Sequence, residues 1–501
     1  MKRFVLILPL FGLVACGGSS EEPETEQNWD TVDVPVEDTL PPFESIESNF
    51  STTDLILPEG FTYTVLFTEG RDMVTRADGV KAPAKGKHDL TVFIPSKDDP
   101  ENKGILYISH ETASPDSILG DGGGATVFDF EKIDGQWQVV GDFHHVDFSP
   151  VGFTEKNCGG SLGPNGNVFT CEETWGYNDG YFESRNYADY SFENGRPWWQ
   201  NLGYVVEVDP EERKAVKRHI SMGKLVHEDI HITPDGLTAY ITDDYDPGIF
   251  VKMEMPSFCD FDNGVLYAWK SGETEEESGS WIELPNDTTS LANIRKIAMQ
   301  KGATIIVRHE WIQEINGKYY ICETGKDYPD WDQTLALGGD IPPWIDKYCT
   351  NEEGVIDDVF GRILEYDPSK ETMRSYLEGG MFSDSIGCFS NPDCNTSVVI
   401  GNKTYLVLSE DINWCDRGRV SQEAEEAKEF YNEIYFLDMD IENPTVDDLL
   451  RFAVAPLGSE TTGVIFLPDG EMIVNIQHPK TSNPAPFNRS CTVLIEGFSK
   501  E

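Results

Sequence analysis

The chain has 501 residues and carries 89 acidic against 38 basic side chains, a formal net charge of −51 at pH 7. That surplus excludes nucleic acid and anionic membrane surfaces as partners, because both would repel the protein. One apolar run lies at the N-terminus, and about 450 residues remain for one large repetitive domain or two to three ordinary ones. Most carboxylates are expected to form a solvated surface, and only a few to be ligands.

The N-terminus is typical of an export signal. Basic residues precede an apolar run from Phe4 to Val14, which is too short to span a membrane. Cys16 follows Leu13-Val14-Ala15, which resembles a bacterial lipobox and predicts cleavage after residues 1–15 and a lipid on Cys16. An ordinary signal peptide is the alternative. Residues 16–50 have too few apolar side chains for a core, so we expect a flexible acidic linker that tethers the protein to the cell envelope, at the outer membrane, on its periplasmic or surface face.

Residues 51–501 are expected to form an all-β domain. Short alternating or β-branched runs are separated by Asp-Pro, Pro-Asp-Gly and Asn-Gly turns, at residues 104–109, 204–209, 231–242, 311–322, 361–367, 398–408 and 464–476. Radial repetition is the usual arrangement of so many short strands, so the pattern predicts a β-propeller; a large β-sandwich is the alternative. Acidic insertions at 175–197, 260–287 and 328–357 interrupt the repeat, and only residues 420–431 have a helical composition.

One stretch combines a thiol with two carboxylates. Cys158 lies at a glycine-rich turn, and a short strand after it ends at Glu172 and Glu173. Because successive strand residues point to opposite faces, these two carboxylates share a pocket only if the strand ends there. A metal site and a structural cysteine beside solvated acids are both compatible with the spacing.

Cysteine counting supports a role for one thiol. Nine cysteines remain after Cys16, and an odd number cannot all pair within one chain. At least one is therefore free, intermolecular or bound to metal, and Cys158 is the candidate because its glycine neighbours leave room for an ion. Cys388 and Cys394 are close enough in sequence to form a disulfide.

Carboxylates recur at the ends of the predicted strands. They include Glu111, Glu172, Glu173, Glu228, Asp243, Asp244, Glu310, Glu323, Asp393, Glu410, Asp411 and Glu460. Strand ends of different blades converge at the centre of a propeller, and so many close carboxylates would repel one another without cations. Oxygen ligands favour calcium, while a thiolate or imidazole favours a transition metal. Each acid alone is a solvated turn residue at least as often as a ligand.

The chain resembles the PhoX-type alkaline phosphatases, a family that also includes uncharacterised relatives. The resembling segments, in order, are residues 57–61, 88–89, 109–111, 123–126, 157–173, 227–228, 243–244, 308–311, 391–393, 458–463 and 475–479. Two positions differ: Ser109 precedes His110-Glu111 where the family has Asn, and Asp243-Asp244 replaces a Glu-Asp pair. Lys2-Arg3 is also not the twin arginine of the family's usual export signal.

The resemblance implies a six-bladed propeller that holds Fe³⁺ and Ca²⁺ and hydrolyses phosphate monoesters. It implies that Cys158 ligates iron, that Glu228 and Glu310 ligate or bridge iron, and that Arg308 binds the phosphate oxygens with its fork of N–H donors. The implied calcium-side or bridging ligands are Glu111, Glu172, Glu173, Asp243 and Asp393, with Glu460 as a further ligand. The histidines beside these acids, His110, His227 and His309, either orient ligands or are packed in the core.

Three functions follow as hypotheses. The first is a phosphomonoesterase that depends on iron and calcium, acts on small phosphorylated substrates and is a monomer. The second is another calcium-dependent propeller hydrolase, of the lactonase or phosphotriesterase type. The third is a non-catalytic envelope lipoprotein in which calcium only stabilises the blades.

Overall fold

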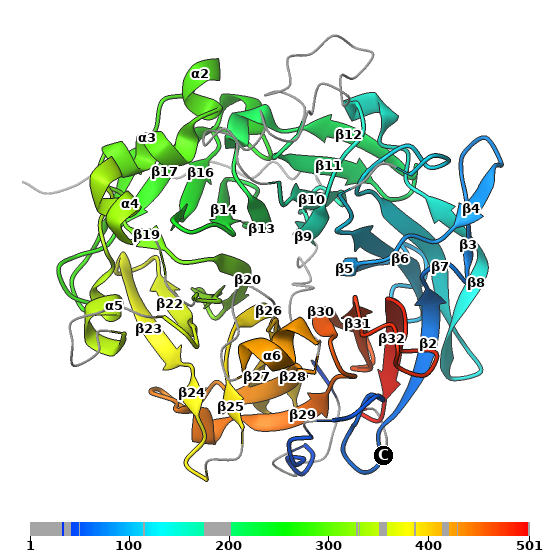
Figure 1. Ribbon diagram of the computed structural model, residues 1–501. Coiled ribbons are helices and arrows are strands. Elements are labelled where there is room, and N and C mark those ends of the chain that lie inside the picture. The colour runs from blue at the N-terminus through cyan, green and yellow to red at the C-terminus, as the bar shows by residue number, and fades with distance from the viewer. Residues whose placement is uncertain are drawn as a thin grey trace, which may run out of the picture.

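The computed structural model describes residues 33–34, 42–49, 51–113, 116–174, 202–326, 329, 331–349, 358–384, 387–412, 420–427 and 429–498. Six antiparallel sheets are arranged as blades around a central axis (Figure 1). The innermost strands contact one another all the way round the axis, and the last contacts the first, which closes the ring. The six-bladed β-propeller is therefore confirmed.

Blades 1 to 3 come from the first half of the chain. Blade 1 runs outward through β5 (His88–Pro95), β6 (Lys103–His110), β7 (Ala125–Ile133) and β8 (Gln136–His145), and carries β3 (Met73–Thr75) and β4 (Lys81–Pro83) at its edge. Blade 2 consists of β9 (Asn157–Leu162), β10 (Val168–Glu172), β11 (Val205–Asp209) and β12 (Lys214–Arg218). Blade 3 consists of β13 (His227–Ile232), β14 (Thr238–Asp243), β16 (Val251–Glu254), β17 (Val265–Lys270) and β18 (Ser280–Glu283).

Blades 4 to 6 complete the ring. Blade 4 consists of β20 (His309–Ile315), β21 (Lys318–Glu323), β22 (Arg362–Asp367) and β23 (Thr372–Glu378). Blade 5 consists of β26 (Pro392–Ile400), β27 (Lys403–Glu410), β28 (Glu433–Asp438) and β29 (Leu450–Val454). Blade 6 joins β30 (Glu460–Phe466), β31 (Met472–Gln477) and β32 (Cys491–Glu496) to β2 (Thr62–Thr68) from near the N-terminus, so the two ends of the domain share one sheet.

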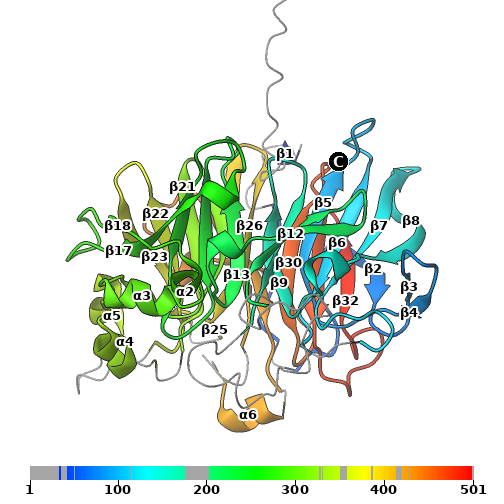
Figure 2. The same cartoon turned by 90° about the horizontal axis from the view of Figure 1, so that it is seen from above.

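Smaller elements lie around the blades. The two-stranded ladders pair β15 (Gly248–Ile249) with β19 (Ile305–Ile306), and β24 (Gly380–Met381) with β25 (Cys388–Phe389). β1 (Asp33–Val34) pairs in parallel with β26. The 3₁₀ turns are η1 (Ser149–Val151), η4 (Ile220–Met222), η5 (Phe261–Asn263) and η6 (Val446–Asp448). In the side view, α6 (Gln422–Glu426) projects beyond one end of the ring and β1 lies at the other (Figure 2).

The helix prediction was partly wrong. The predicted segment does contain α6, but the structure also has α2 (Thr288–Leu291), α3 (Ile294–Gln300), α4 (Trp331–Leu337) and α5 (Pro343–Tyr348). These helices are short, and α3 is stabilised by burial of Ile294, Ala298 and Met299 against the protein rather than by its composition. Helices of four to seven residues are too short to show a clear hydrophobic periodicity in the sequence. None of the described helices is long and apolar enough to cross a bilayer.

Packing against the propeller begins before residue 51, within the predicted linker. Phe43, in the predicted linker, is buried against Phe61, Phe436 and Phe452 with ring centroids 5.0–6.2 Å apart. Such aromatic contacts add to the burial of each ring. The predicted signal peptide and Cys16 lie outside the described residues, as do most of the predicted linker and the 175–197 insertion.

The disulfide expectation differs from the structure. No disulfide links any two of the eight described cysteines, Cys388 and Cys394 included. Cys394 is buried on β26 in the apolar core between blades, beside residues such as Val464 and Val474. It therefore packs as a small apolar side chain. Cys415 lies outside the described residues.

Candidate metal centre

The innermost strands of blades 1 to 5 begin with the same irregularity. After the first paired residue, two residues of the inner strand face one residue of its neighbour, so each strand starts with a β-bulge. A bulge re-aims one side chain without ending the ladder. The first residue of the five bulges forms what we call the inner set: Asp89, Cys158, Glu228, Glu310 and Asp393.

A second ring of residues follows the second strand of each of these blades. Its members are Glu111, Glu173, Asp244, Thr324 and Asp411, which we call the outer set. Each donates its backbone N–H, at 2.9 Å, to the carbonyl oxygen of the residue directly before the inner strand, namely Lys87, Lys156, Val226, Arg308 and Asn391 in the same order. This repeated bond fixes the outer set beside the inner set. Blade 6 departs from the pattern, with Gly463 in its bulge and Glu460 and His478 at its strand ends.

Two groups of these side chains are close enough to share an ion. Ligand atoms of Glu228, Asp244 and Glu310 all lie within 4.8 Å of one another, and so do those of Asp411, Glu460 and His478. The first three residues are buried, and His478 Nε2 is 2.9 Å from Glu460 Oε2. Carboxylate and imidazole donors at this spacing fit a divalent or trivalent cation.

The raised pKa values of the inner-set carboxyl groups indicate that too few positive charges lie near them. Burial raises the pKa of Glu228, Glu310 and Asp393 well above the ordinary carboxyl range, and neighbouring carboxylates raise these pKa values further. Burial and the carboxylates of Glu111 and Asp411, respectively, act in the same way on the pKa values of Asp89 and Glu460. Without cations these groups cannot all be ionised, because like charges in a buried site repel strongly.

Cys158 is the inner-set residue of blade 2, and it directly precedes Gly159, where blades 2 and 3 come close to each other. Its thiol lies 3.1 Å from the carbonyl oxygen of His227, and burial followed by Glu228 raises its pKa well above the ordinary value. A Cβ at Gly159 would collide with the backbone of Glu228, so this glycine allows blades 2 and 3 to approach here, while a Cβ at Gly160 would collide with the backbone of Phe169 in the same blade. A nearby cation would favour the thiolate, which is the form that ligates metals.

Arg308 is held at the edge of the first group. Its backbone is in the left-handed region, with φ of 56°, and its guanidinium donates to Asp244 at 2.8 and 3.1 Å and to Glu310 at 2.9 Å. About a seventh of the side chain remains exposed. The fork of N–H donors is therefore fixed by two carboxylates and still reaches solvent.

The comparison with family models decides the relationship. Residues 131–480 match the model of the family described as alkaline phosphatase PhoX. The chain belongs to this family. Its resemblance to the PhoX family, inferred from short segments of sequence, is thus confirmed, whereas no curated protein sequence matches the chain.

One solved structure supports the fold, and two others are less similar. Pseudomonas fluorescens PhoX in complex with vanadate is 18% identical, with a TM-score of 0.66, and the alignment covers 91% of this chain and 98% of that one. Trypanosoma rangeli sialidase in complex with the inhibitor DANA is 11% identical, with a TM-score of 0.36 and coverage of 88% and 60%. A gluconolactonase of Xanthomonas campestris, XC5397, is 10% identical, with a TM-score of 0.30 and coverage of 83% and 97%.

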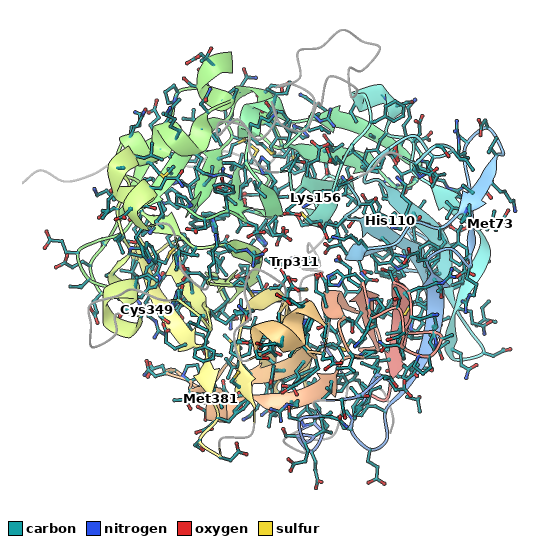
Figure 3. All side chains as sticks on the ribbon, viewed as in Figure 1. Met73, His110, Lys156, Trp311, Cys349 and Met381 are labelled. Atoms are coloured by element: carbon teal, nitrogen blue, oxygen red, sulfur yellow. The ribbon has the colours of Figure 1, made fainter. Side chains whose placement is uncertain are left out.

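Within this PhoX-family chain, most predicted site residues come together. Cys158, Glu228, Glu310 and Asp393 belong to the inner set, Glu111 and Glu173 belong to the outer set, and Glu460 and Arg308 lie beside them. Their roles as ligands or substrate contacts stay predictions. Lys156 and Trp311 lie near the centre of the ring, far from Met73 and Met381 at its rim (Figure 3).

Glu172 and Asp243 are placed elsewhere. Each is the last residue of the second strand of its blade, one position before an outer-set residue, and points to the other face. Glu172 accepts hydrogen bonds from Arg218 at 2.7 Å and Thr154 at 2.8 Å, and Asp243 pairs with both Nε and Nη2 of Arg295. Glu323 and Glu410 hold the same position in blades 4 and 5. We call these four residues the brace set.

Four residues of the centre were not among the predicted ligands: Asp89, Asp244, Asp411 and His478. A signal was present in the sequence, because Asp244, Asp411 and His478 lie beside predicted strand ends and Asp89 lies in a segment that resembles the PhoX family. Choosing between neighbours such as Asp243 and Asp244 requires the strand register, which the sequence does not show.

The histidines next to these acids are core residues. His110 bonds to the carbonyl oxygen of Gly86 and to the Thr126 hydroxyl, and His227 to the carbonyl oxygen of Gly223. Burial lowers the pKa of His227 and of His309 to about 4, so both are neutral at physiological pH. Hydrogen bonds hold His110 and His227, and His309 is buried in the core.

Proposed function

We propose that this protein is a metal-dependent phosphatase that hydrolyses small phosphate monoesters, with ferric iron and calcium as its cations. The observation that carries the proposal is the excess of buried, facing carboxylates in the inner and outer sets, with a thiol among them and a guanidinium at their edge. Membership of the PhoX alkaline phosphatase family supports a hydrolase of the alkaline phosphatase type.

The donor set fits such cations. Glu228, Asp244 and Glu310 would hold one cation together with the nearby Cys158 thiolate, a donor that suits iron. Asp411, Glu460 and His478 would hold another, with mostly oxygen donors. When bound, such cations supply Lewis acidity and neutralise charge on a phosphoryl group.

The protein's own groups then have two tasks. Arg308 donates paired N–H groups to the phosphate oxygens, an arrangement that Asp244 and Glu310 hold ready before substrate arrives. The buried strands behind the inner set exclude water from the centre, which strengthens every charge interaction inside it. In this scheme no Ser or His nucleophile is required.

The test combines activity with metal analysis. Purified protein is assayed with p-nitrophenyl phosphate while iron and calcium per chain are measured by plasma mass spectrometry. The proposal expects phosphatase activity with both metals bound, and loss of iron and activity in Cys158→Ala. Lactone or phosphotriester hydrolysis with calcium alone would support another propeller hydrolase. Calcium-dependent stability without hydrolysis of any ester would support a non-catalytic envelope protein.

We also propose that the protein is a lipoprotein of the cell envelope, at the outer membrane, anchored through Cys16. The basic, apolar and Leu-Val-Ala-Cys order of the N-terminus supports this location. Metabolic labelling with a fatty acid is expected to mark the wild-type chain and not Cys16→Ser. Release of unlabelled wild-type protein into the soluble fraction would contradict the anchor.

A further inference from the structure

Three basic residues occupy one repeated backbone position. Lys87, Lys156 and Arg308 directly precede the inner strands of blades 1, 2 and 4, and their φ angles are 47°, 48° and 56°. Non-glycine residues seldom adopt this left-handed conformation. Here the position is fixed because each carbonyl accepts the backbone N–H of an outer-set residue at 2.9 Å. The three cationic side chains therefore start from equivalent points around the ring.

The two lysines are directed to the same pair of carboxylates. Lys87 Nζ is 2.8 Å from Glu111 Oε2, and Lys156 Nζ is 3.3 Å from Glu111 Oε1 and 2.5 Å from Glu173 Oε2. Both oxygens of Glu111 are thus in contact with an ammonium group. We call these four side chains the lysine clamp.

Charge in the lysine clamp is balanced, unlike charge in the inner set. Two ammonium groups face two carboxylates, at N–O distances of 2.5–3.3 Å. In the first candidate ion group, by contrast, the three carboxylates of Glu228, Asp244 and Glu310 have one guanidinium beside them, that of Arg308. Of the two groups of described residues that could hold an ion, neither includes Glu111 or Glu173.

A divalent cation would not fit among these groups. Calcium binds carboxylate oxygens at about 2.3–2.6 Å, so an ion on Glu111 would lie within a few ångströms of two ammonium nitrogens. Repulsion at such distances is large in a buried site. An ion could bind there only if both lysines moved away.

We propose that Lys87 and Lys156 take the place of a divalent cation at Glu111 and Glu173, so that this corner of the centre carries built-in positive charge and binds no metal. The proposal rests on the proposed function for the presence of cations elsewhere in the centre. It leaves Asp89, Cys158 and the carboxylates of blades 3 to 6 as the donors for metal ions.

The experiment removes the ammonium groups and counts ions. Lys87→Gln/Lys156→Gln keeps side-chain length and polarity while leaving Glu111 and Glu173 without cations. Calcium per chain is measured by equilibrium dialysis with plasma mass spectrometry, and melting temperature is followed against calcium concentration. We expect the double variant to bind about one more calcium per chain than wild type, and to gain more in melting temperature on calcium addition.

Matched variants separate this effect from general charge loss. Lys103→Gln removes an exposed lysine of blade 1 that pairs with Glu131 at 3.0 Å, and is expected to leave the calcium count unchanged. Adding Glu111→Gln and Glu173→Gln to the double variant is expected to abolish the extra calcium. Lys156→Gln alone is measured in the same way, because it removes two of the three contacts if the double variant does not fold.

Two results would overturn the lysine clamp as a cation substitute. One is a folded double or single lysine variant whose calcium count equals that of wild type. The other is loss of a bound calcium when Glu111→Gln/Glu173→Gln is made in the wild-type background. Both readouts count ions without any assay of activity, so they remain decisive even if the protein proves not to be a phosphatase.

Discussion

Two sets of carboxylates whose members are neighbours in sequence have different charged groups around them. Glu172 of the brace set and Glu173 of the outer set are adjacent, as are Asp243 and Asp244. Three brace carboxylates, Glu172, Asp243 and Glu323, pair with arginines, and all four accept from backbone N–H groups. Asp243, for example, accepts from the N–H of Val226 at 3.0 Å and of Ile249 at 3.2 Å. The inner and outer carboxylates lie close to one another instead, with fewer cations: Arg308 contacts Asp244 and Glu310, and Lys156 contacts Glu173. Strand alternation alone produces this difference, because neighbours point to opposite faces.

The difference shows which buried charges serve stability and which are available for ligands. A buried carboxylate with an arginine and backbone N–H donors is satisfied, and in Glu172 and Glu323 the arginine belongs to the same blade. A buried carboxylate whose nearest charged group is another carboxylate is unstable unless a cation binds. Substitutions in the two sets should therefore affect different properties.

The largest expected effect is on the arginine that pairs with the brace residue Glu323. Arg362 is buried and its guanidinium contacts Glu323 at 2.5 Å, Asp358 at 2.6 Å and Glu378 at 2.9 Å. Arg362→Met would leave Glu323 and Asp358 buried without their cation, a loss of about 3–5 kcal/mol in the free energy of unfolding. Urea denaturation measures this loss. Arg374→Met, which breaks a more exposed pair with Glu365 in the same blade, should cost less; equal losses would contradict the brace role.

Exchanging arginines for lysine distinguishes the two sets by activity. Arg308→Lys removes the paired donors beside the centre, and kcat/KM for p-nitrophenyl phosphate is expected to fall about 100-fold with little change in stability. Arg295→Lys, at Asp243, should lower the melting temperature and leave the kcat/KM of the folded protein near wild type. An equal loss of stability in Arg308→Lys and Arg295→Lys would contradict the distinction between the two sets.

Neutralising one carboxylate from each set should change stability in opposite directions in the metal-free protein. Glu172→Gln loses acceptors for Arg218 and the Tyr204 N–H, a cost of about 1–3 kcal/mol. Glu228→Gln removes a charge that faces Glu310 and Asp244, a gain of about 1 kcal/mol. Denaturation of chelator-treated protein measures both. A loss in both variants would mean that the inner set is compensated without metal.

The smallest expected effect is a change in pH dependence on metal removal. Burial, followed by Glu111 and Asp244 and only partly offset by Lys156, raises the pKa of Glu173 to about 7, and the inner-set pKa values are raised as well. The folded metal-free protein then holds more protons than the unfolded chain, so its stability should fall as pH rises from about 4.5 to 7. Melting temperature should drop by about 2 °C or more across this range. Added calcium should reverse the slope; identical profiles with and without calcium would contradict the charge deficit.

Much of the architecture follows from local sequence patterns. Alternation and turn residues indicate the strands, as in residues 231–242, which form the end of β13, the turn after it and nearly all of β14. The recurrence of acids at strand ends indicates a charged centre. These signals are local, because the alternation of apolar and polar residues and the residue types that form turns can both be read within a few positions. The short helices α2 to α5 could not be predicted in the same way, because packing on the blades stabilises them.

The sequence by itself determined a repeated all-β domain with a thiol and many acids at strand ends. Only the tertiary structure decided which acid of each adjacent pair faces the centre, because a bulge and the strand register set that direction. It also decided that Lys87 meets Glu111 and that Lys156 meets both Glu111 and Glu173, since contacts between residues 17 to 45 positions apart depend on how the first two blades are joined. Charge balance in a buried site is a property of such long-range contacts, and no single segment carries it.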